Sequence, residues 1–360
     1  MRLHRPLIPA LLLMPGLIAA NARGGDPVPA AIESSLATHE DQIRQFAYDG
    51  DEATCFASEK GPSADDHFTV VFEKPVTLKS VTARTGKEDG SGKAAGELQV
   101  SADGKTFEKL ATFENGKAAG GPASGAIRSI RIRPTASEKP IAIRELTIDS
   151  DPPVPVFRYP VEFVLDSADA PELKGWLDQT AKACEKAYPM INRELASEGF
   201  QPPHRIWMRL SKKYRGVAAT SGDRIVGAVA YFEKHRDDVG AMIHETVHVV
   251  QAYHGGDNPG WLVEGVADYV RFFKYEPGKL GRINARTAHY DNSYRVSAAF
   301  LNYLVNRYDR EIVRKLNAAM RAGKYDDNLV HTLTGKFLGD LDDEWRERLA
   351  PEREPAAKSR

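Results

Sequence analysis

Apolar and polar positions follow different patterns in the two halves of the chain. Between residues 31 and 150, apolar residues alternate with polar ones in short runs, and turn signals such as Asp103-Gly104 and Asn115-Gly116 separate the runs. Such alternation is typical of half-buried strands. Strands are expected at residues 67–72, 78–83, 97–100, 127–132 and 141–148. Many short strands at this spacing predict a β-sandwich.

A proline-rich linker at residues 151–156 separates this half from a helical one. Apolar residues then recur at helical spacing, and the last segment, 351–360, is charged and predicted to be disordered. Helices are expected at 171–198, 236–254, 262–275, 294–308, 311–321 and 341–350, and strands at 205–210 and 224–232. This mixture predicts an α+β domain over residues 157–350.

The start of the chain is typical of an export signal. A basic beginning is followed by an apolar run at residues 7–20 and by the small residues of Ala20-Asn21-Ala22. The run is too short to span a bilayer, and two prolines interrupt it. We therefore expect removal of residues 1–22, a linker at 23–30, a secreted or periplasmic protein, and no membrane span in the mature chain.

Composition and charge add two constraints. The net charge of −1 argues against a nucleic-acid-binding function, which needs a basic face. The two cysteines, Cys55 and Cys184, lie in different expected domains, so free thiols are expected rather than a disulfide.

The sequence His244-Glu245-Thr246-Val247-His248 carries the clearest chemical signal. Positions i and i+4 lie on one face of a helix, so His244 and His248 can present two imidazoles to one metal ion. Glu245 lies beside the first ligand, where its carboxylate can hold a water molecule and accept its proton as a general base. The motif predicts a Zn²⁺ site that needs a third protein ligand.

Two residues compete for the third ligand position. Glu264 and Asp268 stand at i and i+4 in an apolar segment, so one carboxylate can bind the metal while the other accepts the spare N–H of a ligating histidine. His254 lies at the third-ligand spacing of the longer motif HExxHxxGxxH, but Gln251 occupies the position at which that motif needs a glycine. The pattern therefore favours Glu264, with His254 near the helix end.

Three separated motifs resemble the basic secretory protein family, a group of gluzincin-like peptidases of plants and microbes. The motifs lie in order at residues 243–251, 261–271 and 294–303, and the similarity extends over about 156–308. The resemblance implies a zincin fold in which the edge strand of a sheet lies over a cleft and the HExxH helix lies beneath it. It also implies that His244, His248 and Glu264 bind the metal and that Glu245 is the base. Asp268 would accept a hydrogen bond from one of the ligating histidines.

Tyr294 is the candidate for stabilising the transition state. Peptide hydrolysis places negative charge on the former carbonyl oxygen, and a phenol O–H aimed at that oxygen would help to hold it. Two alternatives stay open: Tyr294 is a buried tyrosine at a helix start, or Tyr290 or His289 takes this role. The strand at 225–232 is expected to bind the substrate backbone by β-addition.

The first half resembles discoidin-type modules, which are jelly-roll sandwiches that often bind carbohydrate or other surface ligands. The resemblance rests on residues 48–54, 100–104 and 141–146. Some members of that family hold a structural Ca²⁺, which makes Asp49, Asp51 and Glu145 candidate ligands. The alternative is that they are turn and surface residues.

These features together predict an exported zinc peptidase. Its expected substrate is a peptide or protein, including glycoproteins, and its sandwich is expected to bind carbohydrate. Two alternatives are a binding protein with a vestigial metal site and a metal-dependent hydrolase of glycan or cell-wall material. Glu245 favours an enzyme, because a purely structural metal site does not need a base.

Overall fold

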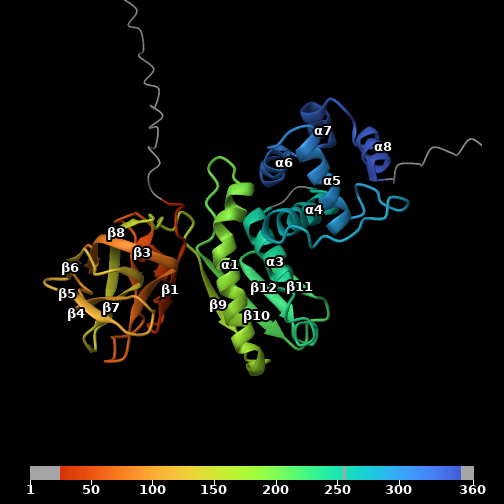
Figure 1. Cartoon of the computed structure of the whole chain (residues 1–360). Helices are drawn as coiled ribbons and strands as arrows, with labels where there is room; N and C mark the ends of the chain where they lie inside the picture. Colours follow the sequence, from red (N-terminus) through yellow and green to blue (C-terminus); the bar gives the residue numbers. More distant parts are fainter. Residues whose placement is uncertain (1–24, 254–256, 350–360) are drawn as a thin grey trace, which may run out of the picture.

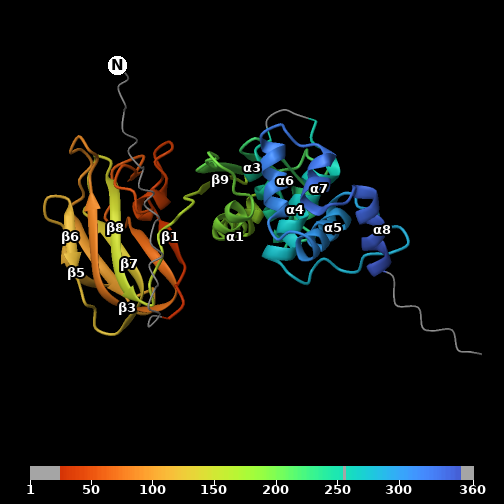
Figure 2. The same ribbon diagram turned by 90° about the horizontal axis from the view of Figure 1, so that it is seen from above.

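The computed structural model describes residues 25–253 and 257–349, which form two domains with separate hydrophobic cores. Buried residues between Val28 and Val154 form one core, and buried residues between Val161 and Trp345 form the other. The sandwich and the helices α5–α8 lie at opposite ends of the molecule, with α1 and β9 between them (Figures 1 and 2). The expected export signal, His254 and the charged tail lie outside the described residues.

The first domain is an antiparallel β-sandwich, as the alternating pattern predicts. Its elements are β1 (Ala30–Ser34), the 3-10 helix η1 (Arg44–Tyr48), β2 (Phe56–Ala57), β3 (Phe68–Thr85), β4 (Gly96–Ser101), β5 (Glu108–Thr112), β6 (Lys117–Gly120), β7 (Ala126–Pro134) and β8 (Ala142–Asp151). One sheet has the order β1-β3-β7-β4-β5, and the other has the order β2-β8-β3-β6. The core lies between these two sheets.

The long strand β3 belongs to both sheets. Its first half pairs with β1 and β7, and its second half pairs with β8 and β6. The expected separation into strands at 67–72 and 78–83 is therefore wrong. The register with β7 shifts between Val71 and Val76, so Pro75, which has no N–H to donate, lies where the ladder is interrupted. The chain bends at this point instead of ending the strand.

A four-stranded sheet of order β11-β12-β10-β9 supports the second domain. Its strands are β9 (Glu162–Asp166), β10 (Arg205–Ser211), β11 (Ala218–Ser221) and β12 (Arg224–Ala228). The first, second and fourth of these are parallel, whereas β11 runs antiparallel to β12 at the edge. Because β12 pairs on both sides, β-addition at residues 225–232 is wrong; the exposed edge belongs to β11.

The expected strand at 224–232 also ends early. After Ala228 the chain forms one helical turn, α2 (Val229–Phe232). This turn buries the Phe232 ring against Trp176 at a centroid distance of 4.5 Å. Burial of this aromatic side chain beneath α1 outweighs the strand preference of the local sequence.

Helices form the rest of the second domain. They are η2 (Pro171–Leu173), α1 (Lys174–Glu194), α3 (Val239–Gln251), α4 (Gly260–Val270), a π-helical turn η3 (Arg271–Tyr275), α5 (Tyr294–Arg307), α6 (Ile312–Arg321), α7 (Asp327–Thr334) and α8 (Leu338–Leu349). The helix α7 was not expected; Asp326 caps its first turn by accepting a hydrogen bond from the N–H of Leu329. None of the described helices has the length and apolar character needed to cross a membrane.

Polar contacts around Glu162 join the two domains. The carboxylate of Glu162 accepts hydrogen bonds from the Thr38 hydroxyl at 2.7 Å and from the Arg44 N–H at 3.0 Å, and it pairs with the Arg44 side chain. Cys55 and Cys184 are both free, as expected from the sequence.

The contact between α4 and α5 makes Gly265 sensitive to substitution. A Cβ atom at Gly265 would lie 2.8 Å from the Cβ of Ser297, whereas one at Gly175 in α1 would meet nothing within 4 Å. We expect Gly265→Ala to lower the free energy of unfolding by about 1–3 kcal/mol, and Gly175→Ala to leave it unchanged or raise it slightly. Urea denaturation of the two variants measures this difference, and equal stability would contradict the tight packing of α4 on α5.

Candidate metal centre

The helix α3 presents the three residues of the HExxH motif to a cleft. Asp238 caps its first turn by accepting a hydrogen bond from the N–H of Ala241. Apolar residues on the helix, including Met242, Ile243 and Val247, are fully buried in the domain core. Burial of this stripe fixes the rotation of α3 and leaves the two histidines on the cleft side.

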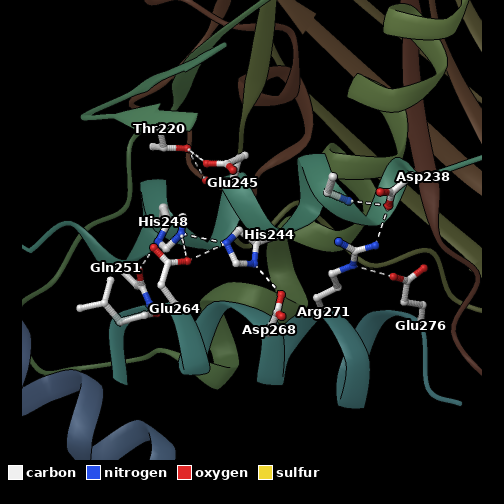
Figure 3. Close-up of polar contacts among 12 residues, drawn as sticks. Thr220, Asp238, His244, Glu245, His248, Gln251, Glu264, Asp268, Arg271 and Glu276 are labelled. Atoms are coloured by element: carbon white, nitrogen blue, oxygen red, sulfur yellow. Dashed lines mark hydrogen bonds and ion pairs between the residues drawn. The ribbon is translucent and has the colours of Figure 1, made fainter. Parts of the chain in front are cut away.

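Three atoms of the type that bind zinc converge above α3 (Figure 3). The Nε2 atoms of His244 and His248 lie 3.0 Å apart, and Oε2 of Glu264 on α4 lies 3.1 Å from the first and 3.4 Å from the second. A tetrahedral zinc site with ligand distances of about 2.0–2.1 Å separates its ligand atoms by about 3.3 Å. The observed spacing therefore fits one ion of this kind. Among the described residues, no other cluster of three or more such ligands is found.

The other nitrogen of each ring contacts a hydrogen-bond acceptor. Nδ1 of His244 lies 2.7 Å from Oδ1 of Asp268, and Nδ1 of His248 lies 2.6 Å from Oε1 of Gln251. The amide nitrogen of Gln251 donates to the carbonyl of Val263, which fixes the orientation of the amide. These partners assign the hydrogen of each neutral ring to Nδ1 and leave a lone pair on each Nε2. Two imidazole lone pairs and a carboxylate thus point at one place, an arrangement that favours a cation.

The carboxylates of the site stabilise positive charge on His244. Burial lowers the pKa of His244, but hydrogen bonds to Asp268 and Glu264 outweigh this effect and raise the pKa to about 9. Burial raises the pKa of Glu264, whereas the hydrogen bonds with His244 and His248 lower it to about 2. A proton on His244 therefore provides positive charge at neutral pH, and a metal ion has to displace it.

Glu245 lies on the side of α3 that faces the edge strand. Its side chain is largely buried, and Oε2 accepts a hydrogen bond of 2.7 Å from the hydroxyl of Thr220 on β11. This partner could not be predicted from the sequence, because Thr220 lies 25 residues away along the chain and belongs to no local motif. The hydrogen bond holds the carboxylate on the side of α3 that faces β11.

Tyr294 lies in the cleft and is 55% exposed. Its ring stacks beside that of His244 at a centroid distance of 6.1 Å. The alternative of a buried tyrosine at the helix start is therefore wrong. Negative charge on Glu264, together with burial and Glu245, raises the pKa of Tyr294, so the phenol keeps its proton as a donor.

The two neighbours considered for the same role lie elsewhere. His289 contacts Asp342 on α8 at 3.0 Å, and the Tyr290 ring packs edge-on against Trp261 at a centroid distance of 4.9 Å. Neither lines the cleft. These contacts assign both residues to the packing of α8 and α4.

A second polar network joins α3 and α4 away from the histidines (Figure 3). Arg271 donates hydrogen bonds to Glu276 at 2.7 Å and to Asp238 at 2.5 Å. Asp238 also accepts a hydrogen bond from Tyr231 at 2.7 Å. Since Asp238 caps α3 and Arg271 follows α4, this network fixes the two helices relative to each other.

The cleft over these residues has a volume of about 870 Å³. The edge strand β11 lines one side with Ala218, Ala219 and Thr220, and Tyr294 lies on another. A volume of this size accommodates several residues of an extended peptide.

The candidate calcium ligands of the sandwich do not gather into a three-carboxylate cluster. Asp51 is exposed and accepts a hydrogen bond from the N–H of Ala53, and Asp49 accepts hydrogen bonds from Thr54. Glu145 is buried; burial and the nearby Asp49 raise its pKa to about 8. The contacts of Asp49 and Asp51 are those of a turn, as the alternative interpretation predicts, and a calcium site stays a prediction.

The second domain combines a four-stranded sheet and helices with a cluster of two histidines and one glutamate that could hold a metal ion. Residues 169–347 match the model of the BSP family, described as a peptidase of plants and bacteria. This match confirms the resemblance of this part of the chain to basic secretory proteins. None of the curated proteins matches the chain.

The sandwich is similar in structure to several modules of sugar-active proteins. One is the CBM32-1 module of a family 31 glycoside hydrolase from Clostridium perfringens, at 19% identity and a TM-score of 0.29 over 33% of this chain and 92% of that one. Another is a fucose-binding module from Streptococcus pneumoniae, at 9% identity and a TM-score of 0.29 over 33% and 92% of the two chains. A third is the CBM32 module of AlyQ in complex with 4,5-unsaturated mannuronic acid, at 18% identity and a TM-score of 0.27 over 33% and 93%.

Metal binding should release a proton from His244. Its pKa of about 9 lies above neutral pH, so the metal-free ring is protonated, whereas a zinc ligand must be neutral. We expect release of about one proton per zinc ion near pH 7.5, falling toward zero as the pH rises above the pKa. Calorimetry in buffers of different ionisation enthalpy measures this number.

Asp268→Asn provides the comparison for that measurement. The substitution removes a carboxylate that raises the pKa of His244, so the variant should release fewer protons and bind zinc about 10–100-fold more weakly. Equal proton release by the parent protein and the variant would contradict the assigned hydrogen bond between Asp268 and His244.

Proposed function

We propose that the second domain is a zinc-dependent peptidase with His244, His248 and Glu264 as metal ligands. The main support for this proposal is that the three ligand atoms lie within 3.0–3.4 Å of one another. They line a large cleft, and Glu245 lines the same cleft. The match to a peptidase family supports the class of reaction. Two histidines and one glutamate form a donor set that zinc adopts in catalytic sites. Bound there, zinc would act as a Lewis acid toward a carbonyl oxygen and lower the pKa of water.

Glu245 is the general base in this proposal. Thr220 holds its carboxylate beside the ligands, where it accepts a proton from the attacking water and later passes it to the leaving amine. Tyr294 donates its O–H to the oxygen on which negative charge develops. Asp268 and Gln251 orient the two imidazoles through their Nδ1 atoms.

The edge strand β11 favours a peptide over a glycan as substrate. It pairs with β12 on one side only, and three of its four residues line the cleft. The backbone on its unpaired side matches that of an extended peptide, which would add to the sheet as a further strand. A glycan offers no such ladder of donors and acceptors.

The proposal extends to location and targeting. The expected export signal supports a secreted or periplasmic enzyme, and the resemblance of the sandwich to discoidin-type modules supports a carbohydrate ligand for it. In this arrangement the sandwich binds a glycan or glycoprotein and keeps the peptidase domain close to its substrate.

Cleavage of a mixed peptide library tests the proposal. Glu245→Gln keeps the shape of the side chain but removes the base, so we expect it to reduce kcat by about 10²–10⁴-fold. Glu233→Gln changes an exposed acid that does not line the cleft, and it should retain the parent rate. Mass spectrometry of the products locates the cleaved bonds.

Two results would contradict the proposal. Equal cleavage by the parent protein and the Glu245→Gln variant would exclude Glu245 as the base. Absence of cleavage by the zinc-loaded parent would favour a glycan substrate or a binding function instead.

A further inference from the structure

Most charged side chains that line the cleft already have partners. Asp268 contacts His244, Glu264 contacts both histidines, and Arg271 is neutralised by Asp238 and Glu276. Arg295 also lines the cleft, is exposed, and has no ion-pair partner within 4.0 Å among the described residues. Arg295 is therefore the one arginine lining the cleft that no carboxylate of the described residues contacts in an ion pair.

The backbone places Arg295 beside the reaction centre. It directly follows Tyr294, whose ring stacks on that of His244. Ser293 and Tyr294 both have positive φ angles, 62° and 50°, which residues with a Cβ rarely adopt. Strain of this kind is retained where the surrounding structure requires a particular chain direction, and here that direction brings α5 to the cleft.

The side chain of Arg295 rests on an apolar support. Its guanidinium carbon lies 5.5 Å from the centroid of the Phe272 ring, and Phe272 also lines the cleft and is 5% exposed. A guanidinium group held against an aromatic face loses little further freedom when it binds a ligand. Its planar fork of donors fits a carboxylate.

We propose that Arg295 binds a carboxylate of the substrate within a few residues of the bond that is cut. This inference rests on the proposed peptidase function and specifies its substrate class: peptides with an acidic group next to the cleavage site. A guanidinium group without an ion-pair partner attracts a carboxylate and disfavours a basic side chain at the same position.

The carboxylate has two possible sources. It belongs either to an Asp or Glu side chain, which suits cleavage within a protein, or to the free C-terminus of the substrate, which suits removal of terminal residues. Both groups offer the same pair of oxygens to the guanidinium fork. Matched peptides separate the two sources.

The test uses the zinc-loaded full chain and three fluorogenic peptides built on one cleaved sequence. The first is neutral and amidated, the second carries Glu in place of Gln beside the cleavage site, and the third has a free C-terminal carboxylate. We expect the parent protein to prefer one acidic peptide over the neutral one by about tenfold in kcat/KM. Arg295→Gln should bring this ratio close to one, and the preference of the parent should weaken with added salt.

Arg310→Gln is the matched control, because Arg310 is exposed, forms no ion pair within the described residues and does not line the cleft. It should keep the ratio of the parent protein. Cleavage without an acidic preference, or a preference that survives in Arg295→Gln, would contradict the role of Arg295 and leave the peptidase proposal intact.

Binding of the same peptides, labelled with a fluorophore, tests the carboxylate site independently of the peptidase activity. Anisotropy measured with Glu245→Gln, alone and combined with Arg295→Gln, requires no turnover. Loss of the acidic preference only in the double variant supports the carboxylate site even if the parent protein cleaves nothing. Equal binding of all peptides by both variants contradicts the site.

Discussion

The geometry of the candidate centre depends on a hydrogen bond between two helices. Nδ1 of His244 on α3 lies 2.7 Å from Asp268 on α4, and the same pair of helices supplies His248 and Glu264. Asp268 sets the orientation of the ring and directs Nε2 toward Glu264. If the two helices shifted by one ångström, the three ligand atoms would no longer face one point. The packing of α3 against α4 is therefore the constraint on which the chemistry depends.

Further contacts hold the two helices at both ends of the site. Gln251, near the end of α3, links His248 to the carbonyl of Val263 on α4. At the other end, Arg271 joins Asp238 to Glu276. Gly240 makes room for this second network, because a Cβ atom there would lie 2.3 Å from Oε1 of Glu276. The centre is thus preorganised on rigid helices, while the edge strand β11 and Tyr294 border the cleft in which a substrate would lie.

Local periodicity explains what could be predicted from the sequence. The i,i+4 spacing of His244 and His248 and the apolar surroundings of Glu264 were sufficient to predict the cluster that the structure brings together. The sandwich could be predicted from alternating short runs, although the bend within β3 joined two expected strands into one. The free thiols followed from the placement of Cys55 and Cys184 in different domains.

Contacts between distant segments explain what the sequence left open. Thr220 and Arg271 contribute to the site only through folding, and no spacing rule connects them to the histidines. Gln251 was noted only as a departure from a glycine-containing motif, although its amide orients His248. The end of α3 could not be predicted from local sequence either. The helix ends at Gln251, three residues before its expected end, and Ala252 adopts the left-handed conformation at φ 45°. Helix ends of this kind are set by tertiary contacts as much as by local preference.

X-ray absorption spectroscopy of the zinc-loaded protein, together with the zinc content per chain, tests the central claim most directly. The account predicts one ion per chain with two imidazole nitrogens and one carboxylate oxygen as protein ligands, at about 2.0–2.2 Å. His248→Ala should remove one of the two nitrogen ligands from the spectrum. A protein that binds no zinc, or a spectrum that is unchanged in His248→Ala, would contradict the assignment of His244, His248 and Glu264 as the metal centre.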